Sequence, residues 1–291
     1  MAKIDEIYLE NLCTILESGV EKKDRTGTGT VSYPFVTIRH DMADGFPLLT
    51  LRRMPFKSAL VELEGFLKGI TSKAWYQEKG CHFWDEWASP DAISQWEKEN
   101  HPITSDAERK KVMKELNELG PVYGSQWNYF SGGQTDKACQ LQAVRKLLKT
   151  EPTSRRMVVS AWNPDYIDSM ALPPCHLLWQ VNVSGNRLNL VYYQRSCDYI
   201  LGHNLTGYGM LLTLLAKEYG YQPGVLGAVF MDCHVYRNHL NGVKVLLHRT
   251  IDRPAPRIKF KKWEGFDKWS AEDVTIENYN PEDKIEFPVS V

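Results

Sequence analysis

The chain has 291 residues, of which 43% are hydrophobic and 24% are charged. These are the proportions of a globular protein, and nine Trp and 14 Tyr residues promise a sizeable core. The formal net charge of −1 argues against a general nucleic-acid or membrane-binding surface, and no apolar run approaches the roughly 20 residues that span a bilayer.

Six cysteines are scattered along the chain without a C-x-x-C pair, and the N-terminus lacks a signal-peptide pattern. We therefore expect reduced thiols in a cytoplasmic protein. The adjacent pairs Cys81-His82 and Cys233-His234 are poorly spaced for chelating one ion, so we expect no metal site.

The first part of the chain alternates helical patterns with polar loops. Apolar residues at helical spacing predict helices over 4–17 and 57–68, and Glu62 lies at the edge of the second apolar face. Such a carboxylate is usually a surface residue, but burial would raise its pKa and suit it to acid–base chemistry. The loop Asp24–Thr30 before a predicted strand at 31–39 fits either a phosphate cradle or a plain hairpin turn.

The middle and end of the chain alternate polar stretches with apolar runs. Residues 88–118 are polar and helix-prone, and we interpret them as a surface insertion. Further elements are expected as a helix at 136–149, strands at 157–162, 176–183 and 188–194, a helix at 205–219 and a strand near 225–231. No repeat or linker interrupts this pattern, so one mixed α and β domain over residues 1–291 is the simplest account.

One cysteine follows a pair of prolines, in Leu172-Pro-Pro-Cys175-His176, at the start of an apolar run. Proline restricts the backbone, so the thiol would be held rigidly beside a histidine, as a nucleophile is. Free cysteines are more often buried in a core, and this motif alone leaves both interpretations open.

Several arginines occur in settings that look positioned, namely Arg25, Arg155, Arg156 and Arg195. A guanidinium group fits a pair of phosphate oxygens, and several of them suit a phosphate dianion. His234 and Tyr236 would lie on one face of a strand of period two. Together with the cysteine, these residues indicate a site for an anionic small molecule.

Motifs along nearly the whole chain resemble the thymidylate synthase family in that family's order: Asp24–Thr30, Phe83–Trp87, Gly120–Gly124, Ser154–Arg156, Leu172–His176, Tyr193–Asp198, Asp232–Tyr236 and Pro288–Val291. The resemblance implies an α+β fold (an α/β sandwich) with a large mixed, twisted sheet flanked by helices and packed across a homodimer. It implies a methyltransferase that converts dUMP to dTMP, with 5,10-methylenetetrahydrofolate as donor of carbon and hydride. It implies no metal, no membrane and no nucleic-acid partner.

The resemblance also assigns roles at the reacting carbon atoms. Cys175 would add to C6 of the pyrimidine and make C5 a nucleophile. Glu62 would organise water and protons around O4 and C5, Tyr123 would help to remove the C5 proton, and His176 would support them. Asp198 and Asn204 complete the catalytic set.

The substrate contacts implied by the resemblance are Arg25, Arg155, Arg156, Gln194, Arg195, Ser196, Asn204, His234 and Tyr236. Arg155 and Arg156 would reach the phosphate in the other subunit's site, and His234 and Tyr236 would bind the ribose hydroxyl. The folate contacts would be Trp84, Leu172, Asp198, Gly202, His203 and Val291, with the terminal Val291 closing over the folate and excluding water.

Asn204 would select the base, because a side-chain amide offers a donor to O4 and an acceptor to N3–H of uracil. The segment Gly202–Tyr208 is two residues shorter than is usual in the family. His203 replaces the usual phenylalanine there, and Gly65 stands where many synthases have tryptophan.

These departures favour an alternative activity on the same fold, a dUMP hydroxymethylase that would use water in place of hydride. A catalytically silent relative that binds or regulates RNA is a further alternative, although every group that the chemistry needs is present. UMP as substrate also remains open.

Overall fold

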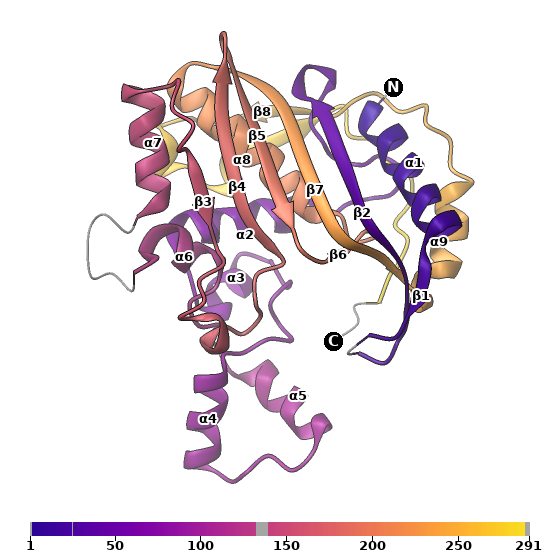
Figure 1. Ribbon diagram of the computed structural model, residues 1–291, viewed down its shortest axis with the longest axis vertical. Helices are drawn as coiled ribbons and strands as arrows, with labels where there is room; N and C mark the ends of the chain where they lie inside the picture. The colour runs from indigo at the N-terminus through magenta and orange to yellow at the C-terminus, as the bar shows by residue number, and fades with distance from the viewer. Residues whose placement is uncertain (1, 25, 132–138, 289–291) are drawn as a thin grey trace. The chain divides into compact units, whose positions relative to one another are not determined.

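The structure, a computed structural model, describes residues 2–24, 26–131 and 139–288. The chain divides into two compact units, one formed by Met1–Phe56 with Trp179–Val291 and the other by Lys57–Leu178. Each unit combines helices with strands (Figure 1).

The first unit is built on a mixed β-sheet. Its elements are α1 (Lys3–Ser18), β1 (Val20–Lys22), β2 (Thr30–Asp41), η1 (Met42–Asp44), most of β4 (His176–Ser184), β5 (Arg187–Gln194), β6 (Cys197–Asp198), α8 (His203–Tyr219), β7 (Gln222–Tyr236), η4 (Arg237–His239), α9 (Leu240–Leu247), β8 (Arg257–Phe260), η5 (Phe266–Lys268), η6 (Ala271–Asp273) and β9 (Val274–Glu277). The strand order is β1-β2-β7-β5-β4, with β6 beside β7. The sheet is mixed because β7 is antiparallel to β2 and parallel to β5 and β6.

One face of this sheet forms the core of the unit. Buried and exposed residues alternate along β2, and Val36 and Ile38 lie on the buried face. Two helices contact the sheet: α1 contacts β2 and β7, and α8 contacts β5 and β7 (Figure 1). Tyr208 of α8 stacks on Tyr192 of β5 with ring centroids 4.0 Å apart. Aromatic stacking and apolar burial therefore join helices and sheet.

The alternate face of the same strands carries exposed apolar side chains. Phe35 is 54% exposed, Val191 40% and Met231 36%. Phe35 and Met231 are directly paired across β2 and β7. An apolar patch of this kind on a sheet is typical of a surface that another protein covers.

A kink in β7 aligns its last residues with two neighbouring strands. Asp232 has a positive φ of 39°, and its carboxylate accepts hydrogen bonds from Lys22 and Ser32. Beyond the kink, β7 still pairs with β2 and also gains β6, so that His234 lies opposite Asp198. The strand is therefore longer than the predicted 225–231, because partners on both sides hold it through the kink.

The second unit is mainly helical in the part that the structure describes. Its elements are α2 (Phe56–Lys68), α3 (Lys73–Glu78), α4 (Pro90–Glu99), α5 (Asp106–Glu115), α6 (Tyr123–Tyr129), α7 (Gln140–Thr150), β3 (Val158–Ser160), η3 (Ile167–Ser169) and the first residues of β4. β3 lies beside the start of β4, where the Ala161 N–H donates to the Leu177 carbonyl at 2.7 Å. Residues 88–118, which we interpreted as an insertion, contain the helices α4 and α5, as their composition predicts, and Ser89 and Ser105 cap the two helices.

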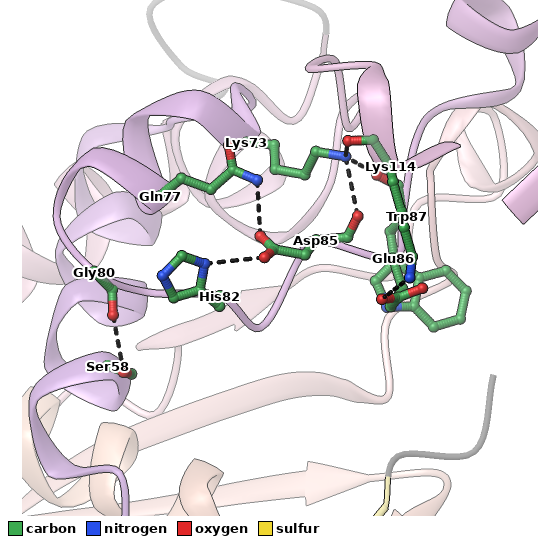
Figure 2. A network of polar contacts seen from close by, with 9 residues as sticks. All are labelled: Ser58, Lys73, Gln77, Gly80, His82, Asp85, Glu86, Trp87 and Lys114. Carbon is green, nitrogen blue, oxygen red and sulfur yellow. Dashed lines mark hydrogen bonds and ion pairs between the residues drawn. The ribbon is translucent and has the colours of Figure 1, made fainter. Parts of the chain in front are cut away.

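A buried lysine ties this insertion to the preceding helix. Lys73 is only 1% exposed, and its Nζ lies within hydrogen-bond distance of four carbonyl oxygens, those of Asp85 (3.1 Å), Trp87 (3.3 Å), Met113 (2.8 Å) and Lys114 (3.0 Å). Figure 2 shows Lys73 with Asp85, Trp87 and Lys114. Two of these carbonyls belong to the last turn of α5, where the helix dipole favours a cation. Burial lowers the pKa of Lys73, and the carbonyls supply the partners that a buried ammonium needs. One side chain thus holds both α5 and the 85–87 segment.

The predicted α+β architecture is confirmed, with differences at element ends. The helix predicted at 205–219 begins at His203, because Gly202 adopts a left-handed φ of 60° immediately before it. The helix predicted at 136–149 corresponds to α7 (Gln140–Thr150), and residues 136–138 lie outside the described residues. The first strand of the 157–194 region is shorter than predicted, at Val158–Ser160.

Candidate functional site

In the second unit, the structure brings Cys175, Tyr123 and His176 together, as the sequence predicts. The backbone N–H of Cys175 donates to the Tyr123 hydroxyl oxygen at 2.8 Å. The Tyr123 ring stacks on His176, with centroids 4.1 Å apart and planes within 15° of parallel. Cys175 itself is half-buried at the start of β4, whereas His176 is buried. Cys175 is therefore partly exposed, and its backbone is fixed by a buried aromatic group.

Glu62 projects from α2 into a buried environment. It is 8% exposed, and burial raises the pKa of its carboxyl group to about 8. The Trp84 indole N–H is close enough to oppose this rise, without the geometry of a full hydrogen bond to any described residue. Glu62 is therefore mostly protonated at neutral pH, where it can both donate and accept a hydrogen bond. The sequence placed Glu62 beside an apolar face, and burial there makes it a candidate acid.

Trp84 is held near these groups by its neighbours in sequence. It is 4% exposed, and its ring lies edge-on to Tyr123 with centroids 5.9 Å apart. The carboxylate of the adjacent Asp85 accepts from Gln77 and contacts His82, each at 2.9 Å (Figure 2). Together with the bonds from the buried lysine, these contacts fix the backbone on which Trp84 stands. The position of Trp84 in the Phe83–Trp87 motif is thus fixed partly by residues outside that motif.

The absence of a side chain at Gly65 makes room for a buried tyrosine. A Cβ atom at Gly65 would lie 2.3 Å from Cε1 of Tyr76, well inside van der Waals contact. Tyr76 is fully buried on α3, and its hydroxyl donates to the Ile70 carbonyl at 3.3 Å. The space that a larger residue at position 65 would need is therefore filled by Tyr76. The spacing of the two residues gives no clue to this contact, because they lie on different helices.

In the first unit, an amide pair fixes the orientation of Asn204. Its Nδ2 donates to Oε1 of Gln194 at 3.1 Å, and Gln194 in turn donates to the Ser196 carbonyl at 2.9 Å. With Nδ2 anchored in this way, Asn204 retains a second N–H and its carbonyl oxygen. One donor beside one acceptor is the pattern that complements O4 and N3–H of uracil.

The predicted phosphate-binding arginines are distributed over both units. Arg195 and Ser196 directly follow β5 and are half-buried, whereas Arg155 and Arg156 are exposed after α7. Arg25 lies outside the described residues. The loop that holds it is organised by Asp24, whose carboxylate accepts from the N–H groups of Thr26 (2.8 Å) and Gly29 (2.6 Å).

His234 and Tyr236 lie together at the end of β7, as predicted. Their ring centroids are 5.1 Å apart and the rings are nearly perpendicular. His234 is buried, and its Nδ1 contacts the Asp232 carbonyl at 2.7 Å, which places a hydrogen on Nδ1. Because β7 pairs with β6, His234 lies opposite Asp198. Burial raises the pKa of Asp198, while the nearby His239 and His234 oppose that rise.

The remaining predicted folate contacts fall in two places. Gly202 and His203 stand at the start of α8, and Leu172 is half-buried ahead of β4. Although His203 keeps some surface exposure, protein surrounds its ring densely, and this desolvation together with Arg52 lowers its pKa to about 4. His203 is therefore a neutral, polar ring at neutral pH. Val291 lies outside the described residues.

Two buried residues near these contacts had no assigned role in the sequence. Arg52 is 6% exposed and donates to the carbonyls of Ile200 and Leu201, just before Gly202. His239 is fully buried, and its Nδ1 lies 3.8 Å from Asp198. His239 follows closely after His234 and Tyr236 in the sequence. This closeness to two predicted site residues was the only sequence feature that pointed to His239.

Two classes of feature are missing from the described residues. No group of three or more His, Cys, Asp or Glu residues there is arranged to hold a metal ion. Among the helices in that part of the chain, none is long and apolar enough to cross a membrane.

The raised pKa of Glu62 predicts a pH-dependent cost in stability. The folded protein keeps this proton up to a pH near 8, whereas an unfolded glutamate loses it near 4.5. The native state therefore binds more protons in this interval, and stability falls as pH rises, by about 1.4 kcal/mol per pH unit. Urea unfolding at several pH values should show this loss for wild type relative to Glu62→Gln. A difference that does not change with pH would contradict the assignment.

Comparison with protein families places nearly the whole chain in one family. The family model described as thymidylate synthase matches residues 6–291, nearly the whole chain and both units. Enzymes of this group act on dUMP with a reduced folate. With its proline-flanked cysteine, buried glutamate and amide-oriented asparagine in the matched region, the chain belongs to the thymidylate synthase family.

Proposed function

We propose that this chain is a thymidylate synthase that converts dUMP to dTMP with 5,10-methylenetetrahydrofolate. The observation that carries the proposal is the accessible Cys175 bonded through its backbone to Tyr123, in a chain of this family. We also propose that both units together form one catalytic domain in a reducing, cytoplasmic compartment, which suits the six free thiols.

The first step assigned to the chain is nucleophilic addition. The Cys175 thiolate forms a bond to C6 of the uracil, and the C5–C6 π electrons move toward C5 and O4. Protonated Glu62 donates a hydrogen bond to the negative charge that develops at O4. Asn204, oriented by Gln194, holds N3–H and O4 so that the base presents C6 to the thiolate.

The later steps need a proton acceptor and a dry site. Methylenetetrahydrofolate supplies a one-carbon unit to C5 and then a hydride. Tyr123, whose oxygen accepts the Cys175 N–H, is the residue that we assign to removal of the C5 proton. Elimination of Cys175 restores the C5–C6 double bond. Trp84, Leu172 and the C-terminal segment are assigned to exclude water from these steps.

A specific observation favours a second candidate, the dUMP hydroxymethylase. His203 is a neutral imidazole where relatives carry phenylalanine, and a polar ring can hold water near the reacting carbon. The preserved Pro288–Val291 tail favours the synthase, because hydride transfer needs solvent to be sealed off.

Product analysis distinguishes the two activities. Purified protein is incubated with dUMP and methylenetetrahydrofolate, and nucleotides and folates are separated by chromatography. The synthase produces dTMP and dihydrofolate in equal amounts, with an increase in dihydrofolate absorbance. Hydroxymethyl-dUMP without dihydrofolate would show that water, not hydride, completes the reaction. UMP serves as the matched substrate for testing the 2′-hydroxyl preference.

We further propose a homodimer in which each site borrows arginines from the other subunit. The exposed apolar patch of Phe35, Val191 and Met231 supports an interface formed by the sheet. The exposure of Arg155 and Arg156 suits residues that reach outside their own subunit.

Subunit mixing tests this arrangement. Cys175→Ala and the double variant Arg155→Ala/Arg156→Ala should each be nearly inactive alone. After the two are unfolded and refolded together, hybrids contain one complete site, and activity should return to about a quarter of wild type. Sites built within single subunits would give no recovery.

Phe35→Asp should weaken the dimer, as light scattering would show.

A further inference from the structure

A tyrosine from one helix fills the space beside Glu62 on another helix. Glu62 and Gly65 are three residues apart on α2, so they are neighbours on one face of that helix. Side chains lean toward the N-terminus of their helix, and a side chain at position 65 would therefore cover the turn that carries Glu62. Gly65 has no side chain, and the ring of Tyr76 from α3 occupies the space where one would begin.

The fit between Gly65 and Tyr76 leaves no room for a further atom. A Cβ atom at Gly65 would lie 2.3 Å from Cε1, 2.4 Å from the hydroxyl oxygen and 2.5 Å from Cζ of Tyr76. Tyr76 is 0% exposed, and its hydroxyl donates to the Ile70 carbonyl at 3.3 Å. The Ile70 N–H in turn donates to the Gly65 carbonyl at 2.9 Å. The polar end of the ring therefore lies against the backbone of α2 and away from solvent.

Contacts on both sides of Tyr76 anchor α3, so the ring cannot simply move aside. At the start of α3, Nζ of Lys73 lies within hydrogen-bond distance of four carbonyl oxygens, three of whose residues Figure 2 shows. Just after α3, Lys79 pairs at 3.4 Å with the carboxylate of Glu64 on α2, which is 1% exposed. The ring is thus held against α2 from both ends of its own helix.

The side chains around Glu62 form an apolar and aromatic enclosure. Phe66 and Trp84 are each 4% exposed, and Cys81 is 0% exposed. Tyr76 and Cys81 lie close enough to Glu62 for its charge to add to the rise that burial causes in the pKa of each. The α3 side of Glu62 is therefore covered by a phenol and a thiol, both of which burial keeps uncharged at neutral pH.

The other titratable groups near this enclosure approach from different directions. On α2, the carboxylate of Glu64 pairs with Lys68 at 2.5 Å as well as with Lys79. Tyr123 and His176 stand on the far side of the Phe66 ring, with centroids 5.0 Å and 5.9 Å from it. Burial is the largest cause of the raised pKa of Glu62, so entry of water would change that pKa most directly.

We propose that Tyr76 is a positioning residue that seals the α3 side of the Glu62 pocket against water. This inference deepens the proposed function and rests on it for one point, that Glu62 acts as the acid at O4. The Tyr76 ring excludes water by filling a space that α2 leaves open at Gly65. Water in that space would solvate a carboxylate and favour loss of the proton that Glu62 has to offer.

Tyr76→Ala opens this space and should lower the pKa of Glu62 from about 8 by about one unit or more, because water would stabilise the ionised form. Infrared spectroscopy detects the proton directly, as the carboxylic acid C=O band that each protein loses when it also carries Glu62→Gln. The alkaline limb of the pH profile of kcat should move down by the same amount. An unshifted band in folded Tyr76→Ala would overturn the proposal, because a purely structural role lowers stability without moving this proton.

Two further variants test whether filling of the space is the cause. Tyr76→Phe keeps the ring and removes only the hydroxyl bonded to Ile70, so its Glu62 band should titrate within about 0.3 unit of wild type. Gly65→Phe alone should be destabilised, because its Cβ atom meets the Tyr76 ring. Gly65→Phe combined with Tyr76→Ala supplies the ring from α2 instead and should bring the titration back toward wild type. A combined variant that titrates like Tyr76→Ala would overturn the proposal.

Tyr76→Leu serves if Tyr76→Ala does not fold. It leaves part of the space filled, so the pKa of Glu62 should fall by about half a unit or more, and an unchanged pKa would overturn the proposal. The infrared titration uses ligand-free protein and needs no turnover. If the pKa shifts while the protein does not convert dUMP, the proposed function fails and the seal stands. If dUMP is converted while the pKa does not move, the seal fails and the function stands.

Discussion

The hydrogen bond from the Cys175 backbone to the Tyr123 hydroxyl is the contact on which the reactive half of this protein depends. It joins Cys175, the nucleophile that we propose, to a ring that also stacks on His176 and meets Trp84 edge-on. One buried aromatic side chain thereby fixes the thiol's backbone, the neighbouring imidazole and the tryptophan wall. Because Tyr123 lies on α6 and Cys175 directly precedes β4, their alignment requires the second unit to be folded as a whole.

Burial then sets the charge states around the reaction. Burial keeps Glu62 protonated and His203 neutral, and it raises the pKa of Asp198. In the function that we propose, uncharged groups would face the base and the arginines would bind the phosphate. Because burial raises the pKa of Glu62, the folded protein loses stability as pH rises. Such a cost is common where a buried acid has a shifted pKa.

The sequence alone predicts features whose physical cause lies in neighbouring residues. The prolines before Cys175, the Asn204 amide and the alternating β2 strand each carry a pattern with a physical meaning. No such pattern marks Lys73, Tyr76 or His239. Their partners are backbone carbonyls or rings contributed by other elements. Lys73 contacts carbonyls up to 41 residues away, and a carbonyl has no signature in a sequence. The kink at Asp232 likewise depends on Lys22, 210 residues away, so the full length of β7 could not be predicted.

The central claim is that Cys175 activates C5 of the pyrimidine by adding to C6. It is tested most directly by release of tritium to water from dUMP labelled at C5, in the presence of methylenetetrahydrofolate. Wild type should release tritium, and Cys175→Ala should release it at least about a thousandfold more slowly, because the C5 proton cannot leave unless C6 is attacked. Binding of dUMP to the variant, measured by calorimetry, should persist. Tritium release at the wild-type rate from Cys175→Ala would contradict the account.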